Sequence, residues 1–227
     1  MRELTFQTFF ERFLPMIGRR ADEFPCGSTD GERHCVAITA AVRRAYEHEF
    51  WPEIMVIEER TPDEFNVVEQ AEDGKQEIDV VQGFFATEAN ARNFTCLLPA
   101  ERIPSGWILQ NAAETVFVRY RPPAPRFTRA KWDKDRTYEP NDVCYVDTKG
   151  KCYRSIKSGT NEYPETAPTY WVEQAFPGFF EQFVQYAAAA DAWRFERQWS
   201  QAGEMESRAQ DILFRLKVAA KSQGGTL

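Results

Sequence analysis

The sequence predicts an α+β protein with helical ends and a β-rich centre. Apolar residues recur at helical spacing before Pro52 and again after Trp171. Between residues 53 and 125, short β-branched or aromatic runs alternate with turn residues. A third observation is an unusually aromatic segment that follows this region. We therefore predict four segments: an N-terminal helical region (1–52), a β-rich region (53–125), a small aromatic β module (126–172) and a C-terminal helical hairpin with a disordered tail (173–227).

Two helices are expected in the N-terminal region. Thr5 can cap the first, which Pro15 and Gly18 end. Its apolar side chains are phenylalanines at helical spacing: Phe6, Phe9, Phe10 and Phe13. The second is predicted from 31 to 50, where Pro52 stops it. Its apolar stripe is Ile38, Ala41, Val42, Ala45, Tyr46 and Phe50.

The β-rich region carries short strand signals near 54–57, 65–68, 78–81, 94–98, 107–109 and 115–120. The turn residues 72–75 lie between the second and third of these runs and predict a hairpin there. The proline-rich stretch 121–125 is stiff and extended, so we place a boundary at that point.

The aromatic module contains six tryptophan or tyrosine rings that admit two interpretations: Trp132, Tyr138, Tyr145, Tyr153, Tyr170 and Trp171. They can form a platform on which a sugar stacks, with Asp142 and Asn161 as hydrogen-bonding groups. They can instead form a miniature core or a protein interface. The second interpretation is favoured because most rings in so small a unit must pack internally.

The C-terminal segment predicts one helix from 177 to 201, a break at Gly203, and a second helix from 204 to 222. The first helix is apolar on more than one side, which implies that a neighbouring domain or a second subunit covers it. The side chains assigned to that subunit interface are Phe179, Phe183, Tyr186, Phe195 and Trp199. The second helix carries one stripe, interpreted either as domain core or as a partner-docking face: Met205, Ala209, Ile212, Leu213 and Leu216.

Composition sets limits on the class of protein. Hydrophobic residues make up 43% and charged residues 28% of the 227 residues, as in ordinary globular proteins. The net charge of −7 disfavours general nucleic-acid binding. No run is apolar enough to span a membrane, and charged residues interrupt the start, so no signal peptide is expected. The five cysteines are expected to be free thiols; Cys152 should face Tyr145 and not Cys144.

No set of residues predicts catalysis, a metal site or a cofactor. His34 and Cys35 are neighbours on a helix, where adjacent side chains diverge and cannot readily pair. Glu58 and Glu59 are also sequence neighbours, whereas acid–base pairs converge across a cleft. The glycine-rich phosphate loops and the nucleophile elbow are missing from the sequence. We therefore expect a binding or assembly protein, not an enzyme.

Residues 132–171 resemble the short chitin-binding-type carbohydrate module. The matching residues are Trp132, Tyr138, Asp142, Val143, Tyr145, Tyr153, Gly159, Pro164 and Trp171, with Asn141 where glycine is common. This resemblance implies the alternative function of a carbohydrate-binding protein that uses the aromatic module.

The whole layout resembles the head-to-tail adaptor (connector, neck) proteins of tailed bacteriophages. The N-terminal part carries most of this, through Pro25-Cys26, then Ala37, Ala40, Ala41, Ala45 and Glu49-Phe50. The resemblance implies a virion protein that forms a homo-oligomeric ring, expected to be a dodecamer, beneath the portal protein. It also implies that the C-terminal helices dock onto the portal, that another face receives a tail or neck component, and that DNA passes through the lumen without specific binding. The stripe from Met205 to Leu216 is then the expected portal-docking surface.

Overall fold

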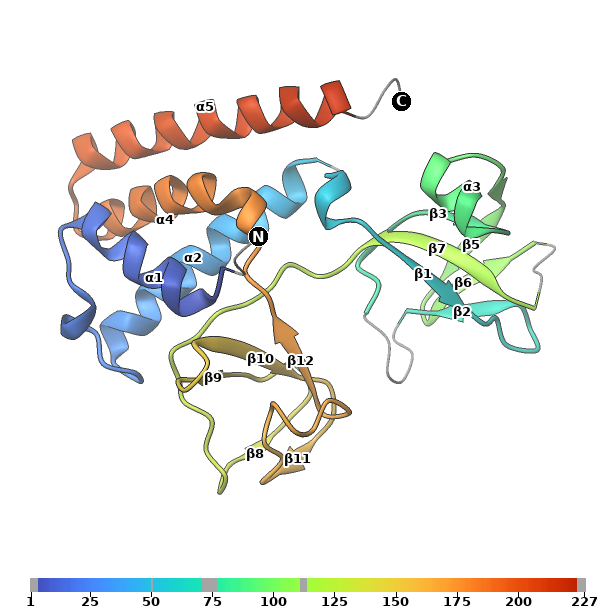
Figure 1. Cartoon of the computed structure of the whole chain (residues 1–227), viewed down its shortest axis with the longest axis horizontal. Coiled ribbons are helices and arrows are strands. Elements are labelled where there is room, and N and C mark those ends of the chain that lie inside the picture. The colour runs from blue at the N-terminus through green and yellow to red at the C-terminus, as the bar shows by residue number, and fades with distance from the viewer. Residues whose placement is uncertain (1–3, 50, 71–76, 111–113, 224–227) are drawn as a thin grey trace. The chain divides into compact units, whose positions relative to one another are not determined.

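A computed structural model describes residues 4–49, 51–70, 77–110 and 114–223, with only the backbone of 221–223. It confirms the α+β class, with helices at both ends of the chain and sheets between them. The chain divides into two compact units (Figure 1). We call Met1–Glu49 with Ala124–Leu227 the terminal unit, and Phe50–Pro123 the central unit. The aromatic module and the helices of both chain ends thus belong to one unit.

The first two helices follow the sequence prediction closely. Helix α1 (Phe6–Phe13) begins where the Thr5 hydroxyl accepts from the Thr8 N–H at 3.2 Å, and its four phenylalanines are buried. A 3₁₀ helix (Leu14–Ile17) follows and ends at Gly18, whose φ is 69°. A second 3₁₀ helix spans Ala21–Glu23.

Helix α2 (Thr29–His48) begins at Ser28, whose hydroxyl accepts from the Gly31 N–H at 3.2 Å. Its predicted apolar stripe is buried from Ile38 to Tyr46. Phe50, the last member of that stripe, lies outside the described residues, as do the predicted hairpin turn 72–75 and residues 224–227 of the tail predicted from 223, while Gln223 itself ends the last helix.

The C-terminal hairpin corrects two predictions. Helix α4 (Glu181–Phe195) follows a 3₁₀ helix (Gly178–Phe180), and α5 (Trp199–Gln223) runs straight through Gly203. The chain turns at Arg197, whose φ is 61°. The Gln198 N–H donates to Trp193 O at 2.9 Å and the Arg197 N–H to Arg194 O at 3.0 Å, the bonding pattern of a Schellman motif. The predicted break at Gly203 was therefore wrong, and Trp199 belongs to the second helix.

Helix α4 lies among other helices of the same unit. It packs against α1, α2 and α5, and its alanines 187–190 are buried (Figure 1). Small side chains let neighbouring helices approach closely on several sides. Apart from Phe195 at its end, the many-sided apolar surface of α4 is thus covered by its own chain, including the N-terminal helices, so it does not by itself require a second subunit.

Replacing Gly203 with alanine is expected to raise the free energy of unfolding by about 0.5–1 kcal/mol, because glycine costs that much inside a helix. A Cβ added there meets no atom within 4 Å. Chemical denaturation measures the change. Gly150→Ala is the matched control: its φ is 68° and its Cβ would lie 2.6 Å from Gln7 Cβ, so this variant should lose stability.

The aromatic module contains two small sheets. One has the order β12-β10-β9, built from β12 (Trp171–Gln174), β10 (Lys151–Ser155) and β9 (Val143–Val146). The other pairs β11 (Gly159–Thr160) with β8 (Thr137–Tyr138). Cys152 lies opposite Tyr145 in the register of β10 and β9, as predicted, and all five cysteines are free.

The central unit has two antiparallel sheets around one core. The first has the order β1-β7-β3-β4, from β1 (Val56–Arg60), β7 (Val116–Arg121), β3 (Val80–Phe85) and β4 (Leu97–Leu98). The second has the order β2-β6-β5, from β2 (Val67–Glu69), β6 (Gly106–Leu109) and β5 (Ala100–Ile103). Both sheets contribute to a core that includes Val68, Phe84, Trp107 and Val118.

In the central unit, the structure differs from two of the sequence predictions. Strands β2 and β3, which flank residues 72–75, pair in different sheets and do not form the predicted hairpin. Part of the strand predicted at 94–98 instead ends a short helix, α3 (Glu88–Asn93), at Phe94, whose φ is 53°. Each sheet includes pairs of strands that are distant in sequence. Turn residues act locally, so they do not reveal which strand will pair with which. A 3₁₀ helix (Pro52–Ile54) precedes β1.

Candidate interaction surface

His34 and Cys35 do not form a nucleophilic pair. The His34 ring packs edge-on against Phe24, with ring centroids 4.9 Å apart, and burial lowers its pKa. Cys35 is buried, and burial raises the pKa of its thiol. At neutral pH the imidazole is therefore uncharged and the thiol keeps its proton. Within the described part of the chain, no three His, Cys, Asp or Glu side chains are grouped so as to hold a metal ion.

Four of the six rings of the aromatic module form core contacts. Tyr138, Tyr145, Tyr153 and Trp171 are buried. The Tyr138 and Trp171 rings meet edge to face at 4.9 Å, and the Trp171 indole N–H donates to Glu162 O at 2.9 Å. A sugar cannot stack on rings enclosed in this way, so the platform assignment is corrected for these four. Trp132 and Tyr170 are half-buried at the edge of this core.

A buried polar cluster, which we call the Arg129 cluster, ties the module to the N-terminal helices. The Arg129 guanidinium donates to Gln7 Oε1 at 3.0 Å and to the Cys26 sulfur at 3.2 Å, and lies 4.7 Å from the Phe10 ring centroid. The Arg129 backbone N–H donates to Glu32 Oε1 at 2.6 Å. Sequence reasoning missed this cluster, because its members are far apart in the chain.

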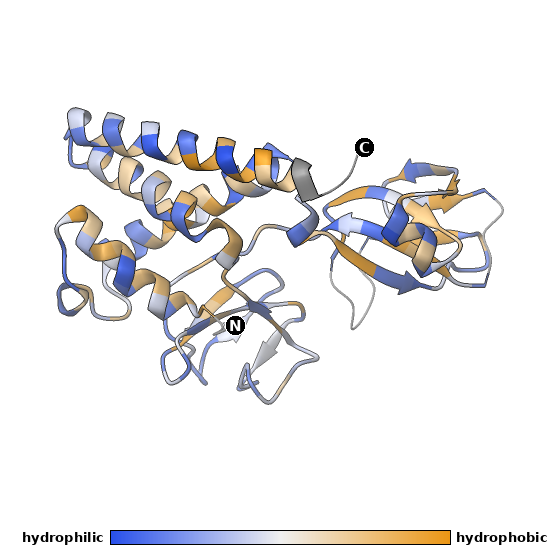
Figure 2. Cartoon of the chain, turned by 45° about the horizontal axis from the view of Figure 1, so that its top comes forward, coloured by the Kyte–Doolittle hydropathy of each residue, from blue (hydrophilic) through white to orange (hydrophobic). Residues whose placement is uncertain are grey.

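Hydrophilic and hydrophobic residues are interleaved along α5 (Figure 2), and their exposure divides them between two faces of the helix. The predicted docking stripe lies on the inner face, which packs on the rest of the terminal unit: Ala209 is buried, and Met205, Ile212, Leu213 and Leu216 are half-buried. Lys217, one turn after Leu213, pairs with Glu49 at the end of α2 at 2.6 Å. Most of the stripe's apolar surface is therefore used within the chain, which supports the domain-core interpretation of the stripe.

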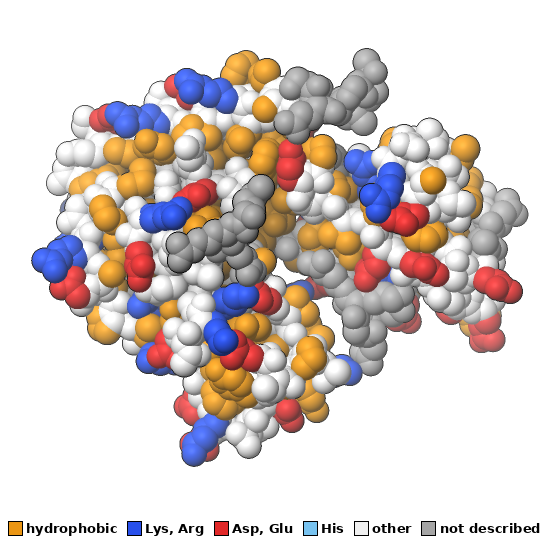
Figure 3. Space-filling view, viewed as in Figure 1, with side chains coloured by type: hydrophobic (Ala, Val, Ile, Leu, Met, Phe, Trp, Pro, Cys, Tyr) orange, Lys and Arg blue, Asp and Glu red, His pale blue; other side chains and the backbone are white. Residues whose placement is uncertain are grey.

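The outer surface of the hairpin carries large apolar side chains that the described residues leave uncovered. Phe214 is 67% and Val218 53% exposed on α5, while Phe195 is 65% and Trp199 68% exposed at the turn. Figure 3 shows hydrophobic side chains at the surface along α5. Isolated exposed apolar residues are ordinary, but two exposed pairs on one hairpin, one at the turn and one on α5, indicate interaction surfaces.

The residues assigned to a subunit interface separate into two groups. Phe183 is buried in the core of the terminal unit, and Phe179 and Tyr186 are half-buried. The assignment of Phe183 is corrected, because a buried core side chain has no surface to offer a partner. Only Phe195 and Trp199 of this set are largely exposed.

An ion-pair network links α2 to the two helices that carry these exposed side chains. Arg44 of α2 pairs with Asp191 of α4 at 2.7 Å, and Arg194 of α4 pairs with Asp191 at 2.7 Å and with Glu206 of α5 at 2.8 Å. These side chains are only partly exposed, so water screens them less than it screens ordinary surface pairs. The network therefore holds α5 in one position on α4.

The fold and the exposed hairpin surface together define a two-unit α+β protein with an uncovered apolar face. No protein-family model matches this chain, and no curated protein matches it either. Of the helices in the described residues, none is long and apolar enough to cross a membrane.

Proposed function

We propose that this chain is a structural virion protein, a head-to-tail adaptor that forms a ring between the portal protein and the tail or neck components. The observation that carries the proposal is that the C-terminal hairpin leaves two apolar pairs uncovered: Phe195 with Trp199 at the turn, and Phe214 with Val218 on α5. Burying such side chains is the main favourable term in protein association. The resemblance of the N-terminal helices to adaptor proteins supplies the particular role.

The chain's charge is compatible with a DNA channel. Its net charge is −7, and a negative lumen repels the phosphate backbone instead of retaining it. In this proposal DNA passes through the ring without sequence-specific contacts, and assembly takes place in the host cytoplasm.

Mixing the purified chain with the portal protein from the same genome tests the proposal. We expect mass photometry to detect portal rings that carry several added copies of the chain. Trp199→Glu should weaken this binding at least tenfold, which corresponds to about 1.4 kcal/mol, because Trp199 is exposed on the hairpin. Phe65→Glu changes a 71% exposed ring of the central unit and should bind normally. A portal that never gains mass would rule out the adaptor role.

A carbohydrate-binding role is the second candidate, and the half-buried edge of the aromatic module favours it. The Trp132 ring is only half-buried, and it meets Tyr163 edge to face at 5.1 Å, so part of an aromatic pair stays open to solvent. Isothermal titration with chitin oligomers should then give heat that Trp132→Ala removes. Absence of heat with the wild-type chain would exclude chitin as a ligand.

A further inference from the structure

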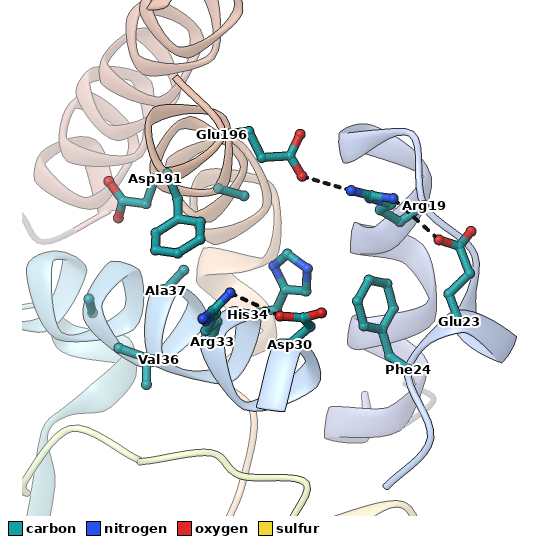
Figure 4. A pocket seen from close by; sticks show the side chains of 13 residues that line it. Arg19, Glu23, Phe24, Asp30, Arg33, His34, Val36, Ala37, Asp191 and Glu196 are labelled. Carbon is teal, nitrogen blue, oxygen red and sulfur yellow. Dashed lines mark hydrogen bonds and ion pairs between the residues drawn. The ribbon is translucent and has the colours of Figure 1, made fainter. Parts of the chain in front are cut away.

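An open pocket lies in the terminal unit between the first half of α2, the end of α4 and the segment that follows α1 (Figure 4). Its volume is about 670 Å³, within the usual range of roughly 300–1,000 Å³ for ligand pockets. The apolar part of its lining is Phe24, Val36, Ala37, Ala40, Ala192 and Phe195. Val36 is 68% and Phe195 65% exposed although both line a concave site. The pocket is therefore an apolar depression that the described residues do not fill.

Charged side chains of both signs surround this depression. Arg19 pairs with Glu196 at 3.0 Å and with Glu23 at 3.6 Å, and Arg33 pairs with Asp30 at 3.0 Å (Figure 4). The Arg33 guanidinium also lies 4.8 Å from the Phe195 ring centroid. A rim of this kind suits a ligand with an apolar centre and flanking charges, because each charge of the ligand then lies near a rim side chain of opposite charge.

The outer face of α5 has an apolar centre with a charged side chain of each sign beside it. Phe214 and Val218 are exposed one turn apart, and Asp211 and Arg215 lie on the same face of the helix. Neither Asp211 nor Arg215 has an ion-pair partner within the described part of the chain. Two apolar anchors at i and i+4 are the pattern by which a helix binds in a groove. We call these four residues the α5 anchor.

A chain cannot place its own α5 anchor in its own pocket. Lys217 pairs with Glu49, so the anchor lies near the C-terminal end of α2. The pocket lies along α2 from Asp30 to Ala40. At a rise of about 1.5 Å per residue, Glu49 is about 14–28 Å along the helix from that part. The pocket and the anchor are therefore separate surfaces of one copy, and any contact between them joins two copies.

We propose that the α5 anchor of one copy docks into the pocket of the next copy. This proposal rests on the proposed ring function and identifies its subunit contact. The contact is heterologous, because a different surface is used on each side, and such contacts give closed rings when the rotation between neighbours closes. Phe214 and Val218 cover Val36 and Phe195 of the neighbour, while Arg215 meets the carboxylates of the rim and Asp211 its arginines.

Two single variants remove one side of the contact each. Phe214→Glu alters the anchor and Val36→Glu the pocket, and both side chains are exposed, so neither change disturbs the core. Sedimentation velocity at micromolar concentration should show multimers for the wild-type chain and for the control Phe65→Glu. Phe214→Glu and Val36→Glu should each sediment as single chains, with unchanged circular dichroism.

Mixing the two variants tests the head-to-tail geometry. Phe214→Glu keeps an intact pocket and Val36→Glu an intact anchor, so one contact can form between them. The mixture should give species of two chains and nothing larger. Assembly of Val36→Glu like the wild type, a mixture that stays at one chain, or a wild-type chain that does not self-associate would each overturn the proposal.

These outcomes separate the subunit contact from the adaptor role. If both variants still form multimers that bind the portal, the contact assigned here is wrong while the adaptor role stands. If only Phe214→Glu loses assembly, α5 packs on α5 of a second copy, and the pocket takes no part. If the wild type forms multimers that the variants lose, yet no form binds the portal, the contact stands and the adaptor role fails.

Discussion

Glu32→Ala is expected to lower the free energy of unfolding by about 3 kcal/mol, because hydrogen bonds to a charged group contribute about 1.5–3 kcal/mol each. The Glu32 carboxylate accepts from the Arg129 N–H at 2.6 Å and from the Thr128 hydroxyl at 2.8 Å. Alanine would leave these donors in a partly buried site with no acceptor.

Helix α2 also binds the backbone just before Thr128 and Arg129. Thr39, seven residues after Glu32 and on the same face of α2, accepts from the Phe127 N–H at 3.0 Å. Side chains of α2 thus satisfy the backbone donors of Phe127 and Arg129, which lie in an extended segment before its first bridge to β9 at Lys131. Removing Glu32 should therefore loosen the attachment of the aromatic module as well as the helix.

Urea denaturation of the Glu32 variants measures this effect. Glu32→Gln keeps one acceptor oxygen and should lose about half as much stability. Glu47→Ala makes the same change on the exposed side of α2, where Glu47 pairs with Arg43, and should cost at most about 0.5 kcal/mol. Equal losses for Glu32→Ala and Glu47→Ala would show that the Arg129 cluster does not stabilise the terminal unit.

Glu58→Ala is expected to destabilise the central unit by about 2–3 kcal/mol. Its carboxylate accepts from the Arg60 guanidinium at 2.6 Å and from the Tyr120 hydroxyl at 2.8 Å. Arg60 is fully buried, and burial together with the bond to Glu58 raises the pKa of Tyr120, which keeps the hydroxyl protonated as a donor. Truncation would leave two buried donors without this acceptor.

Hydrogen exchange followed by mass spectrometry can assign this loss to one unit. Amides of β1, β3 and β7 should exchange faster in Glu58→Ala, whereas α2 and α4 should keep their wild-type rates, since the residues belong to different compact units. Glu101→Ala, on the exposed strand β5, is the control and should change neither unit. Faster exchange of α4 in Glu58→Ala would show that the two units unfold together.

Local patterns predicted the elements whose ends depend on nearby residues. The cap at Thr5 set the start of α1, Gly18 ended the 3₁₀ helix that follows it, and the strand signal at 115–120 predicted β7. The helix break at Gly203 failed for an energetic reason. Glycine costs only about 1 kcal/mol in a helix, and packing of α5 on α4 exceeds that cost. Arg197 adopts a left-handed φ of 61°, which its own side chain does not favour, and the chain turns there instead.

By itself, the sequence determined the α+β class, the helical ends, the free thiols and the aromatic character of residues 126–172. Only the tertiary structure decided that α4 is covered by its own unit, that the stripe around Leu213 faces inward while Phe214 faces out, and that Arg129 meets Gln7 and Cys26. The physical reason is the distance along the chain over which each kind of interaction acts. Caps, turns and periodicity act over a few residues, whereas burial depends on which distant segments pack together, and one sequence pattern serves an inner and an outer face equally well.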